Sequence, residues 1–149
     1  MLIRLQSAVD PFTPERFVHL GESHFRGLGV TRQKSAYLLH LSESIVSRQF
    51  SFRRLARLDD SKAHIYLTRM KGIGSWSADV YLLMAMRRAD IWPAGDLALA
   101  VAAKELLNLD RRPTPEELVT IAERWRPFRA VAARMLWQHY LGKKSLRDC

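Results

Sequence analysis

Apolar residues recur every three or four positions along most of the chain, which is the spacing of amphipathic α-helices. One such stripe carries Tyr37, Leu41 and Ile45. No segment alternates apolar and polar residues as a half-buried strand does, and no internal repeat is evident. Residues 1–12 are the least readable part of the chain. The sequence therefore predicts a compact all-α protein built from several helices.

Capping residues mark where these helices begin. Serine, threonine and aspartate are preferred just before a helix, and proline is favoured at its first position. Thr114-Pro115-Glu116-Glu117 also has the signature of a capping box. The expected helices, in chain order, run from Thr13-Pro14 through about His24, from Thr31, from Ser51 with Phe52, Leu55 and Leu58, from Asp60 or Ser61 through Met70, from Trp76 to about Arg87 behind a Ser75 cap, from Leu97 to Leu107 behind Asp96, from Thr114, and from Pro127 to before Gly142. A loose basic tail is expected over residues 143–149.

The length and charge of the chain narrow its class. A chain of 149 residues suits one domain, so residues 1–149 are interpreted as a single helical domain. Lysine and arginine outnumber aspartate and glutamate by 24 to 15, and the net charge of +9 favours a polyanionic partner. The basic residues are spread along the chain rather than gathered beside an apolar segment, which favours nucleic acid over a membrane surface.

Other kinds of site find little support in the sequence. Cys149 is the single cysteine, so we expect neither an intramolecular disulfide nor a cysteine-ligated zinc or iron–sulfur site. The five histidines show no metal-ligand spacing, and we predict no metal and no other cofactor. No segment has the long apolar run of a signal peptide or transmembrane helix. A cytoplasmic location, with nucleoid association in a bacterium, is therefore expected.

The turn Lys71-Gly72-Ile73-Gly74 separates two predicted helices. Glycine allows unusual backbone angles and close approach of a ligand to the main chain, while Ile73 can turn inward. Free amides at the start of the next helix form an anion site, to which Ser75 and Ser77 add hydroxyls and Lys71 adds charge. The alternative is an ordinary helix–helix turn in which glycine ends a helix. If the turn binds DNA phosphates, a side chain at Gly72 should occupy the space of the phosphate.

The wider pattern favours DNA binding. Leu67 lies five residues before Gly72, and the small Ala78 lies where two helices must approach closely. The whole stretch resembles the helix–hairpin–helix motif of DNA repair proteins, placed here at about residues 61–87. This resemblance implies that the turn holds the DNA backbone without reading its sequence.

A carboxylate follows the hairpin at a characteristic distance. Asp96 comes after the loop Pro93-Ala94-Gly95, one helix beyond the hairpin. This arrangement resembles the helix–hairpin–helix (HhH-GPD) DNA glycosylase superfamily, and most of all its alkylation-repair branch, the bacterial DNA-3-methyladenine glycosylase II type. Glu123-Arg124-Trp125-Arg126-Pro127-Phe128-Arg129 and Met135-Leu136-Trp137 resemble that branch too, and the likeness covers roughly residues 13–141. It implies a compact multi-helix glycosylase fold that acts on damaged double-stranded DNA in base-excision repair.

The resemblance implies that Asp96 is the catalytic carboxylate. A carboxylate stabilises the oxocarbenium-like sugar that forms when a base leaves, and a helix N-terminus favours the ionised form. Aspartate is also a preferred N-cap, so the residue itself leaves cap and catalyst equally open. Relatives that also cut the strand carry a lysine nucleophile at the position of Trp76, which predicts a monofunctional glycosylase here.

Aromatic residues are candidates for the pocket of the flipped base. Electron-rich rings suit a cationic alkylated base, on which they can stack once it has been flipped out. The resemblance implies that Trp76 and Trp137 occupy aromatic pocket positions of the family. Tyr81 is a weaker candidate, and core packing is favoured for both Tyr81 and Trp92.

The resemblance also has a departure at the front of the chain. Relatives carry further helical sequence before the position of Thr13, where this chain has twelve residues. We therefore expect a fold that lacks the N-terminal part, and a partner chain could cover that side. The open alternatives are a non-catalytic DNA-binding module, a subunit of a repair complex, and a glycosylase for uracil or hypoxanthine.

Overall fold

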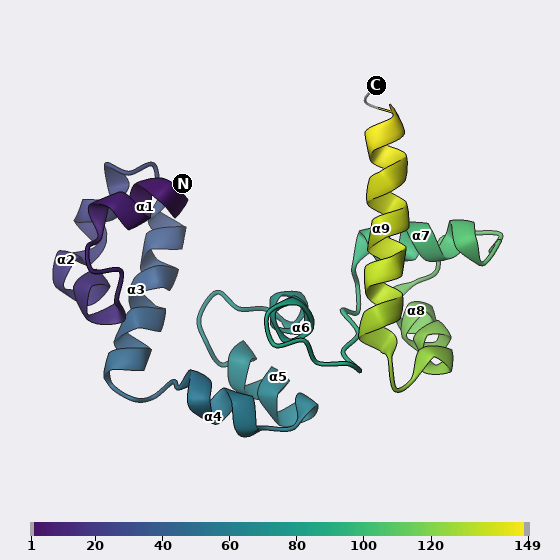
Figure 1. Ribbon diagram of the computed structural model, residues 1–149, viewed down its shortest axis with the longest axis horizontal. Coiled ribbons are helices and arrows are strands. Elements are labelled where there is room, and N and C mark those ends of the chain that lie inside the picture. Colours follow the sequence, from purple (N-terminus) through teal and green to yellow (C-terminus); the bar gives the residue numbers. More distant parts are fainter. Residues whose placement is uncertain (1, 148–149) are drawn as a thin grey trace. The chain divides into compact units, whose positions relative to one another are not determined.

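The computed structural model describes residues 2–147, and the side chains of residues 3–25 and 27–142 among them. This part of the chain contains helices and loops and no strand, so the predicted all-α class is confirmed (Figure 1). The helices, in chain order, are α1 (Leu2–Ala8), α2 (Pro14–Arg26), α3 (Arg32–Val46), α4 (Phe52–Arg57), α5 (Asp60–Thr68), α6 (Ser75–Met84), α7 (Leu97–Leu106), α8 (Pro115–Ala122), the 3₁₀ helix η1 (Glu123–Trp125) and α9 (Arg129–Arg147).

Contacts divide the chain into two compact units. The N-terminal unit comprises residues up to Leu58 together with Ile65–Ile73, and the C-terminal unit comprises Asp59–His64 together with the residues from Gly74 onward. Helix α5 therefore contributes its first turns to one unit and its last turns to the other. The expectation that residues 1–149 form a single domain stays a prediction.

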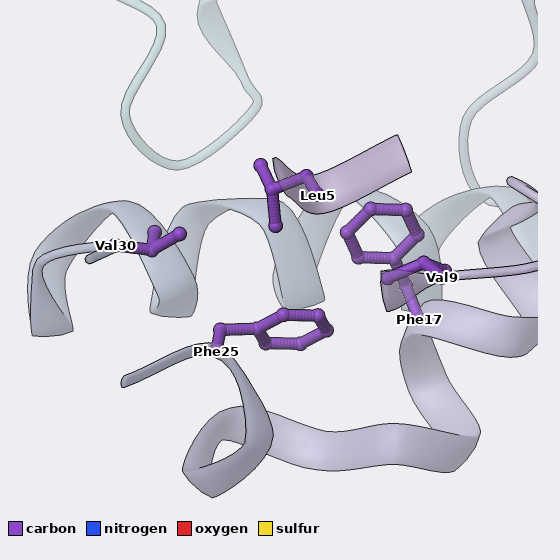
Figure 2. Close-up of a cluster of buried hydrophobic side chains, with 5 residues drawn as sticks. All are labelled: Leu5, Val9, Phe17, Phe25 and Val30. Carbon is purple, nitrogen blue, oxygen red and sulfur yellow. The ribbon is translucent and has the colours of Figure 1, made fainter. Parts of the chain in front are cut away.

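A small apolar core holds the N-terminal unit together (Figure 2). Its buried members come from α1 and the residue after it, from α2, and from the segment between α2 and α3: Leu5, Val9, Phe17, Phe25 and Val30. The rings of Phe17 and Phe25 stack with their centroids 5.2 Å apart. The sequence pattern missed α1, although the four-residue spacing of Leu5 and Val9 is the apolar interval of a helix.

Threonine and serine caps begin α2, α3 and α4 as predicted. The hydroxyls of Thr13, Thr31 and Ser51 accept hydrogen bonds from backbone amides of the first turns, at 3.3–3.4 Å. Within α2, however, Gly21 has φ of 72°, which interrupts the helix with a kink that the apolar pattern did not reveal.

Helix α3 has the expected half-buried stripe of Tyr37, Leu41 and Ile45, but it buries three serines more deeply. Tyr37 is half-buried, whereas the most buried side chains of the helix are small serines: Ser35, Ser42 and Ser44. Each of these hydroxyls donates to the carbonyl oxygen four residues earlier, at 2.7–3.2 Å. Serine can be buried here because the helix's own backbone satisfies its hydroxyl.

Helices α7, α8 and α9 build the core of the C-terminal unit. Alanines and leucines that are fully buried allow these helices to approach closely: Leu99, Ala102, Ala103, Leu118 and Ala133. The predicted capping box at the start of α8 is present, because Thr114 and Glu117 exchange hydrogen bonds between side chain and backbone.

The last helix differs from its prediction at both ends. Helix α9 begins at Arg129 rather than Pro127 and continues past Gly142 to Arg147. Glycine ends a helix when it adopts positive φ, and Gly142 is not among the glycines that do so. The expected loose tail from residue 143 is therefore wrong as far as Arg147, and Cys149 lies outside the described residues.

An ion-pair cluster ties the loop before Asp96 to the start of α9. Arg129 donates from Nε to Asp90 Oδ1 at 2.8 Å and also to Glu123, while Arg126 donates to both carboxylates. Burial works to raise the pKa of Asp90, but the hydrogen bonds and charges of the two arginines outweigh it and hold that pKa below its usual value.

Of the helices described, none combines the length and apolar character needed to cross a membrane.

Candidate nucleic-acid interface and carboxylate site

The hairpin turn lies between the end of α5 at Thr68 and the start of α6 at Ser75, so α5 ends two residues before the predicted Met70. The Met70 amide donates to the Leu67 carbonyl at 2.9 Å, and the Ile73 amide donates to the Met70 carbonyl at 3.0 Å. Two consecutive tight turns therefore follow α5.

Gly72 is required by this turn for two reasons. Its φ is 89°, in the region that only glycine adopts readily. A Cβ built on it would lie 2.4 Å from the Tyr37 ring of α3, which belongs to the same unit. The expectation that a side chain at Gly72 would occupy the place of a phosphate is therefore wrong, because it would meet Tyr37 instead.

Gly74 offers the open surface that Gly72 does not. Its φ is −84°, which suits any residue, and nothing lies within 4 Å of a Cβ built there. Gly74 is also the N-cap of α6, and no side chain caps this helix end. The prediction that Ser75 caps the helix is wrong, because Ser75 is instead its first residue.

The first amides of α6 are free to bind a ligand. The first hydrogen bond of the helix runs from the Ala78 amide to the Gly74 carbonyl at 2.9 Å. The preceding amides of Ser75, Trp76 and Ser77 therefore lack intrahelical acceptors, as at any helix N-terminus. The residues that carry these amides are exposed. Free amides at a helix N-terminus suit an anion such as a phosphate.

A chain of three polar side chains, which the sequence did not reveal as a group, joins α5 to the start of α6. His64 Nδ1 lies 2.7 Å from Asp79 Oδ1, and His64 Nε2 lies 3.3 Å from Ser75 Oγ. Burial raises the pKa of the Asp79 carboxyl, and the hydrogen bond and charge of His64 only partly oppose that rise. No motif spacing links residues 64, 75 and 79, so only the packing of the two helices shows their relation.

Asp96 is both a helix cap and the acceptor of a tryptophan N–H. Its Oδ1 accepts from the Leu99 amide at 2.9 Å, which makes it the N-cap of α7 as predicted. Its Oδ2 accepts from Trp76 Nε1 at 2.8 Å. The residue is 7 % exposed. Two N–H donors and a helix N-terminus thus surround one carboxylate, a setting that stabilises an anion.

The loop before Asp96 is shaped by glycine and proline. Gly95 has φ of 80°, and the Asp96 amide donates back to the Pro93 carbonyl at 3.3 Å. Pro93 is fully buried, which holds the loop against the C-terminal unit. The conformation of this loop leads the chain to Asp96, the N-cap of α7.

The aromatic candidates fall into different environments. Trp92 is buried and packs on Trp125 with centroids 5.5 Å apart, so the packing role favoured for it is confirmed. Trp76 is 49 % exposed although its indole N–H is bound to Asp96. Tyr81 and Trp137 are half-buried on α6 and α9. The pocket roles of Trp76, Tyr81 and Trp137 stay predictions.

A hollow of about 280 Å³ is lined in part by Asp96. It is lined by residues of the loops and helix starts around α7 and α8, including Gly95, Leu97, Arg112 and Thr114. None of the three predicted pocket aromatics lines it. The ionisable residues described here also contain no group of three or more that could hold a metal ion.

Comparison with protein families matches residues 2–127 to the HhH-GPD superfamily of base excision DNA repair proteins. This match covers most of the chain, and the chain belongs to that superfamily. The match to the superfamily begins at residue 2 and therefore includes α1, whereas the resemblance noted from the sequence begins at about residue 13.

Individual relatives are similar over most of this chain. A DNA-3-methyladenine glycosylase of Bacillus subtilis is 27 % identical over 124 residues, which are 83 % of this chain and 41 % of that protein. DNA-3-methyladenine glycosylase 1 of Schizosaccharomyces pombe is 30 % identical over 127 residues, 85 % of this chain and 56 % of that protein. The chain thus spans about half the length of these curated relatives.

Solved structures show the same likeness. The 3-methyladenine DNA glycosylase of Schizosaccharomyces pombe in complex with abasic DNA superposes with a TM-score of 0.80 at 28 % identity, covering 91 % of this chain and 68 % of that one. A DNA-3-methyladenine glycosidase of Bacillus halodurans gives a TM-score of 0.83 at 26 % identity, covering 93 % and 65 %. The predicted HhH-GPD superfamily is confirmed, and the DNA-3-methyladenine glycosylases named above are similar to this chain.

Proposed function

We propose that this protein is a monofunctional DNA glycosylase that hydrolyses the N-glycosidic bond of alkylated bases of the 3-methyladenine type. The observation that carries this proposal is the buried carboxylate of Asp96 beside an exposed tryptophan, Trp76, in a chain of this superfamily. The names of the similar proteins support the substrate class.

Asp96 is suited to stabilising positive charge on the sugar. Loss of the base leaves an oxocarbenium-like centre, which a nearby fixed carboxylate stabilises, and the same group orients the attacking water. Each carboxylate oxygen can accept two hydrogen bonds, so the bonds from Leu99 and Trp76 leave acceptor capacity on both oxygens. An N-alkylated purine already carries positive charge, and its departure needs no second carboxylic acid.

Trp76 supports hydrolysis rather than strand cutting. The strand-cutting members of the family use a lysine at this position to form a Schiff base, and an indole cannot do so. The indole N–H is engaged by Asp96, and half of the side chain is exposed. A ring held in this way beside the carboxylate can stack on a cationic base through cation–π attraction.

In this proposal the hairpin binds the DNA backbone. The amides at the start of α6 and the hydroxyls of Ser75 and Ser77 would contact phosphates and hold the duplex without reading its sequence. Binding of this kind weakens as salt concentration rises, because counterions released from the DNA drive it.

A release assay tests the proposed activity. Duplex DNA methylated to carry 3-methyladenine is incubated with the protein and with an Asp96→Asn variant, and the freed base is measured. Release by the wild type alone supports the proposal. Normal DNA binding with no release at any protein concentration favours a non-catalytic module, and release of uracil or hypoxanthine alone from matched duplexes would defeat the cationic-base argument.

We also propose a partner chain on the N-terminal side. Ile3 of α1 is 78 % exposed and Phe12 is 47 % exposed in the N-terminal unit, which is apolar surface that a second chain could cover. Light scattering of the protein with and without DNA tests this proposal. A clean monomer that is active in the release assay would contradict it.

A further inference from the structure

Asp79, His64 and Ser75 form a continuous line of hydrogen bonds that ends at the N-terminus of α6. The Asp79 side chain is 11 % exposed and the His64 side chain 29 % exposed, while Ser75 is on the surface. The His64 ring lies between the other two, with one nitrogen near each of them. The line therefore leads from a buried carboxylate to the hydroxyl proposed to contact phosphate.

The hydrogen positions in this line follow from what each group can donate. An ionised carboxylate only accepts, so the Nδ1–H of His64 donates to Asp79. In the neutral imidazole the other nitrogen, Nε2, is then an acceptor, and the Ser75 hydroxyl donates to it. A hydroxyl has a single hydrogen, and phosphate oxygens at neutral pH only accept. With neutral His64, Ser75 cannot donate to Nε2 and to a phosphate at the same time.

Protonation of the ring removes this conflict. Protonated His64 donates from both nitrogens, so Nε2–H points at a lone pair of Ser75 Oγ and the hydroxyl hydrogen becomes free. We propose that His64 takes up a proton when a DNA phosphate binds at the start of α6, and that the Ser75 hydroxyl transmits this linkage. The inference rests on the proposed function of the hairpin as a phosphate site.

The charges around His64 suit a ring that gains a proton on binding. Asp79 places a carboxylate against Nδ1, and a phosphate adds negative charge beyond Ser75. Asp60, one turn earlier on α5, is paired with Arg88 at 3.3 Å, so these two charges largely offset each other. Burial of Asp79, which raises its pKa, adds a reason for this carboxylate to keep a cationic partner.

The consequence is an affinity for DNA that rises as pH falls through the range in which imidazoles titrate. The linked proton makes the complex bind more protons than the free protein. When binding raises the pKa of one group by one unit, the affinity differs by at most about tenfold between high and low pH. We therefore expect the affinity to change about threefold to tenfold between pH 6 and pH 8.

Calorimetry measures the proton directly. The full chain is titrated with a short duplex that contains a tetrahydrofuran abasic-site analogue, at pH 7, in two buffers with different heats of ionisation. The difference in observed heat gives the number of protons taken up on binding. We expect a clear fraction of one proton for the wild type.

Three variants separate this linkage from ordinary attraction between DNA and a cationic histidine. Ser75→Ala keeps His64 and Asp79 but removes the hydroxyl, and we expect it to abolish most of the proton uptake. Ser77→Ala removes another exposed hydroxyl at the same helix end, and it should weaken binding while leaving the proton uptake intact. His64→Gln carries an amide that does not titrate, and it should lose most of the proton uptake, as Ser75→Ala does. Thermal melting checks that each variant is folded.

The outcomes are distinct. Proton uptake that survives in Ser75→Ala, or that is absent from a wild type which binds DNA, overturns the linkage and leaves the hairpin proposal standing. A folded wild type that binds no duplex at any pH from 6 to 8 contradicts the proposed function and this inference together. A loss of uptake in both Ser75→Ala and His64→Gln, with uptake retained in Ser77→Ala, supports the linkage.

Discussion

The indole N–H of Trp76 donates to Oδ2 of Asp96 at 2.8 Å, and the two residues come from the starts of different helices, α6 and α7. The bond fixes one side of the carboxylate while the Leu99 amide fixes the other. The resemblance places a lysine nucleophile at this position in the strand-cutting relatives. Here the same position carries an indole whose N–H binds the Asp96 carboxylate.

Loss of the Trp76 N–H should slow base release more than it weakens DNA binding. Trp76→Phe keeps an aromatic face but removes the donor to Asp96. Because hydrogen bonds to charged groups contribute about 1.5–3 kcal/mol, we expect the single-turnover rate to fall about tenfold to a hundredfold. Affinity for an abasic duplex should change less than threefold. Single-turnover release with saturating protein measures the effect, and an unchanged rate would show that the hydrogen bond is not used.

Two substitutions of Asp96 separate its roles as cap and catalyst. Asparagine is as good an N-cap as aspartate, but its amide nitrogen replaces the oxygen that accepts from Trp76. Asp96→Asn should therefore keep the cap on α7 and lose the Trp76 bond, while base release falls at least about a hundredfold. Asp96→Ala should also lose the cap on α7, at a cost of about 1 kcal/mol, or about 2–4 °C in melting temperature. Calorimetric melting beside the release assay tests both. Equal release by Asp96→Asn and the wild type would leave Asp96 as a cap alone.

The two glycines of the hairpin should respond differently to substitution. Gly74→Glu meets open space and an ordinary φ, so it should leave the protein folded. Its negative charge beside the α6 amides should weaken binding to every duplex irrespective of sequence. Fluorescence anisotropy with damaged and undamaged duplexes measures this, with Gly74→Ala as the uncharged control. Normal affinity in a folded Gly74→Glu variant would contradict the hairpin as the phosphate site.

Gly72→Ala should instead act on stability. Its φ of 89° and the Tyr37 ring 2.4 Å from an added Cβ both oppose any side chain. We expect a loss of at least about 1 kcal/mol in the free energy of unfolding. Tyr37→Ala removes the steric conflict but not the backbone strain, so the double variant should recover part of the loss. Denaturant unfolding of the set measures this, and full stability of Gly72→Ala would show that the turn relaxes.

The ion pairs of Asp90 predict a loss of stability in acid. The folded-state pKa of Asp90 is held below its unfolded value by Arg129 and Arg126 against the opposing effect of burial. A depressed carboxyl pKa stabilises the folded protein above the unfolded pKa, which is about 4, and this stabilisation disappears as pH falls through the folded pKa. Asp90→Asn should therefore melt below the wild type at pH 6, and the gap should close below about pH 4. A gap that stays constant across this range would contradict the assignment.

Local signals in the sequence were sufficient for much of the fold. Thr13, Thr31, Ser51, Asp96 and Thr114 all begin helices as predicted, because capping depends on a side chain and the few amides that follow it. Predictions failed where a distant contact decided the outcome. Ser75 resembles a cap in the sequence, yet its hydroxyl lies next to His64, which is eleven residues away.

The sequence by itself determined the all-α class, the family, the hairpin and the position of the candidate carboxylate, since each of these depends on short-range periodicity or on residues a few positions apart. Only the tertiary structure decided which groups meet: Trp76 with Asp96, His64 with both Asp79 and Ser75, and Tyr37 with Gly72. The physical reason is that these contacts depend on how helices are packed and rotated against one another. That packing is set by the fit of many side chains together, and no local pattern encodes it.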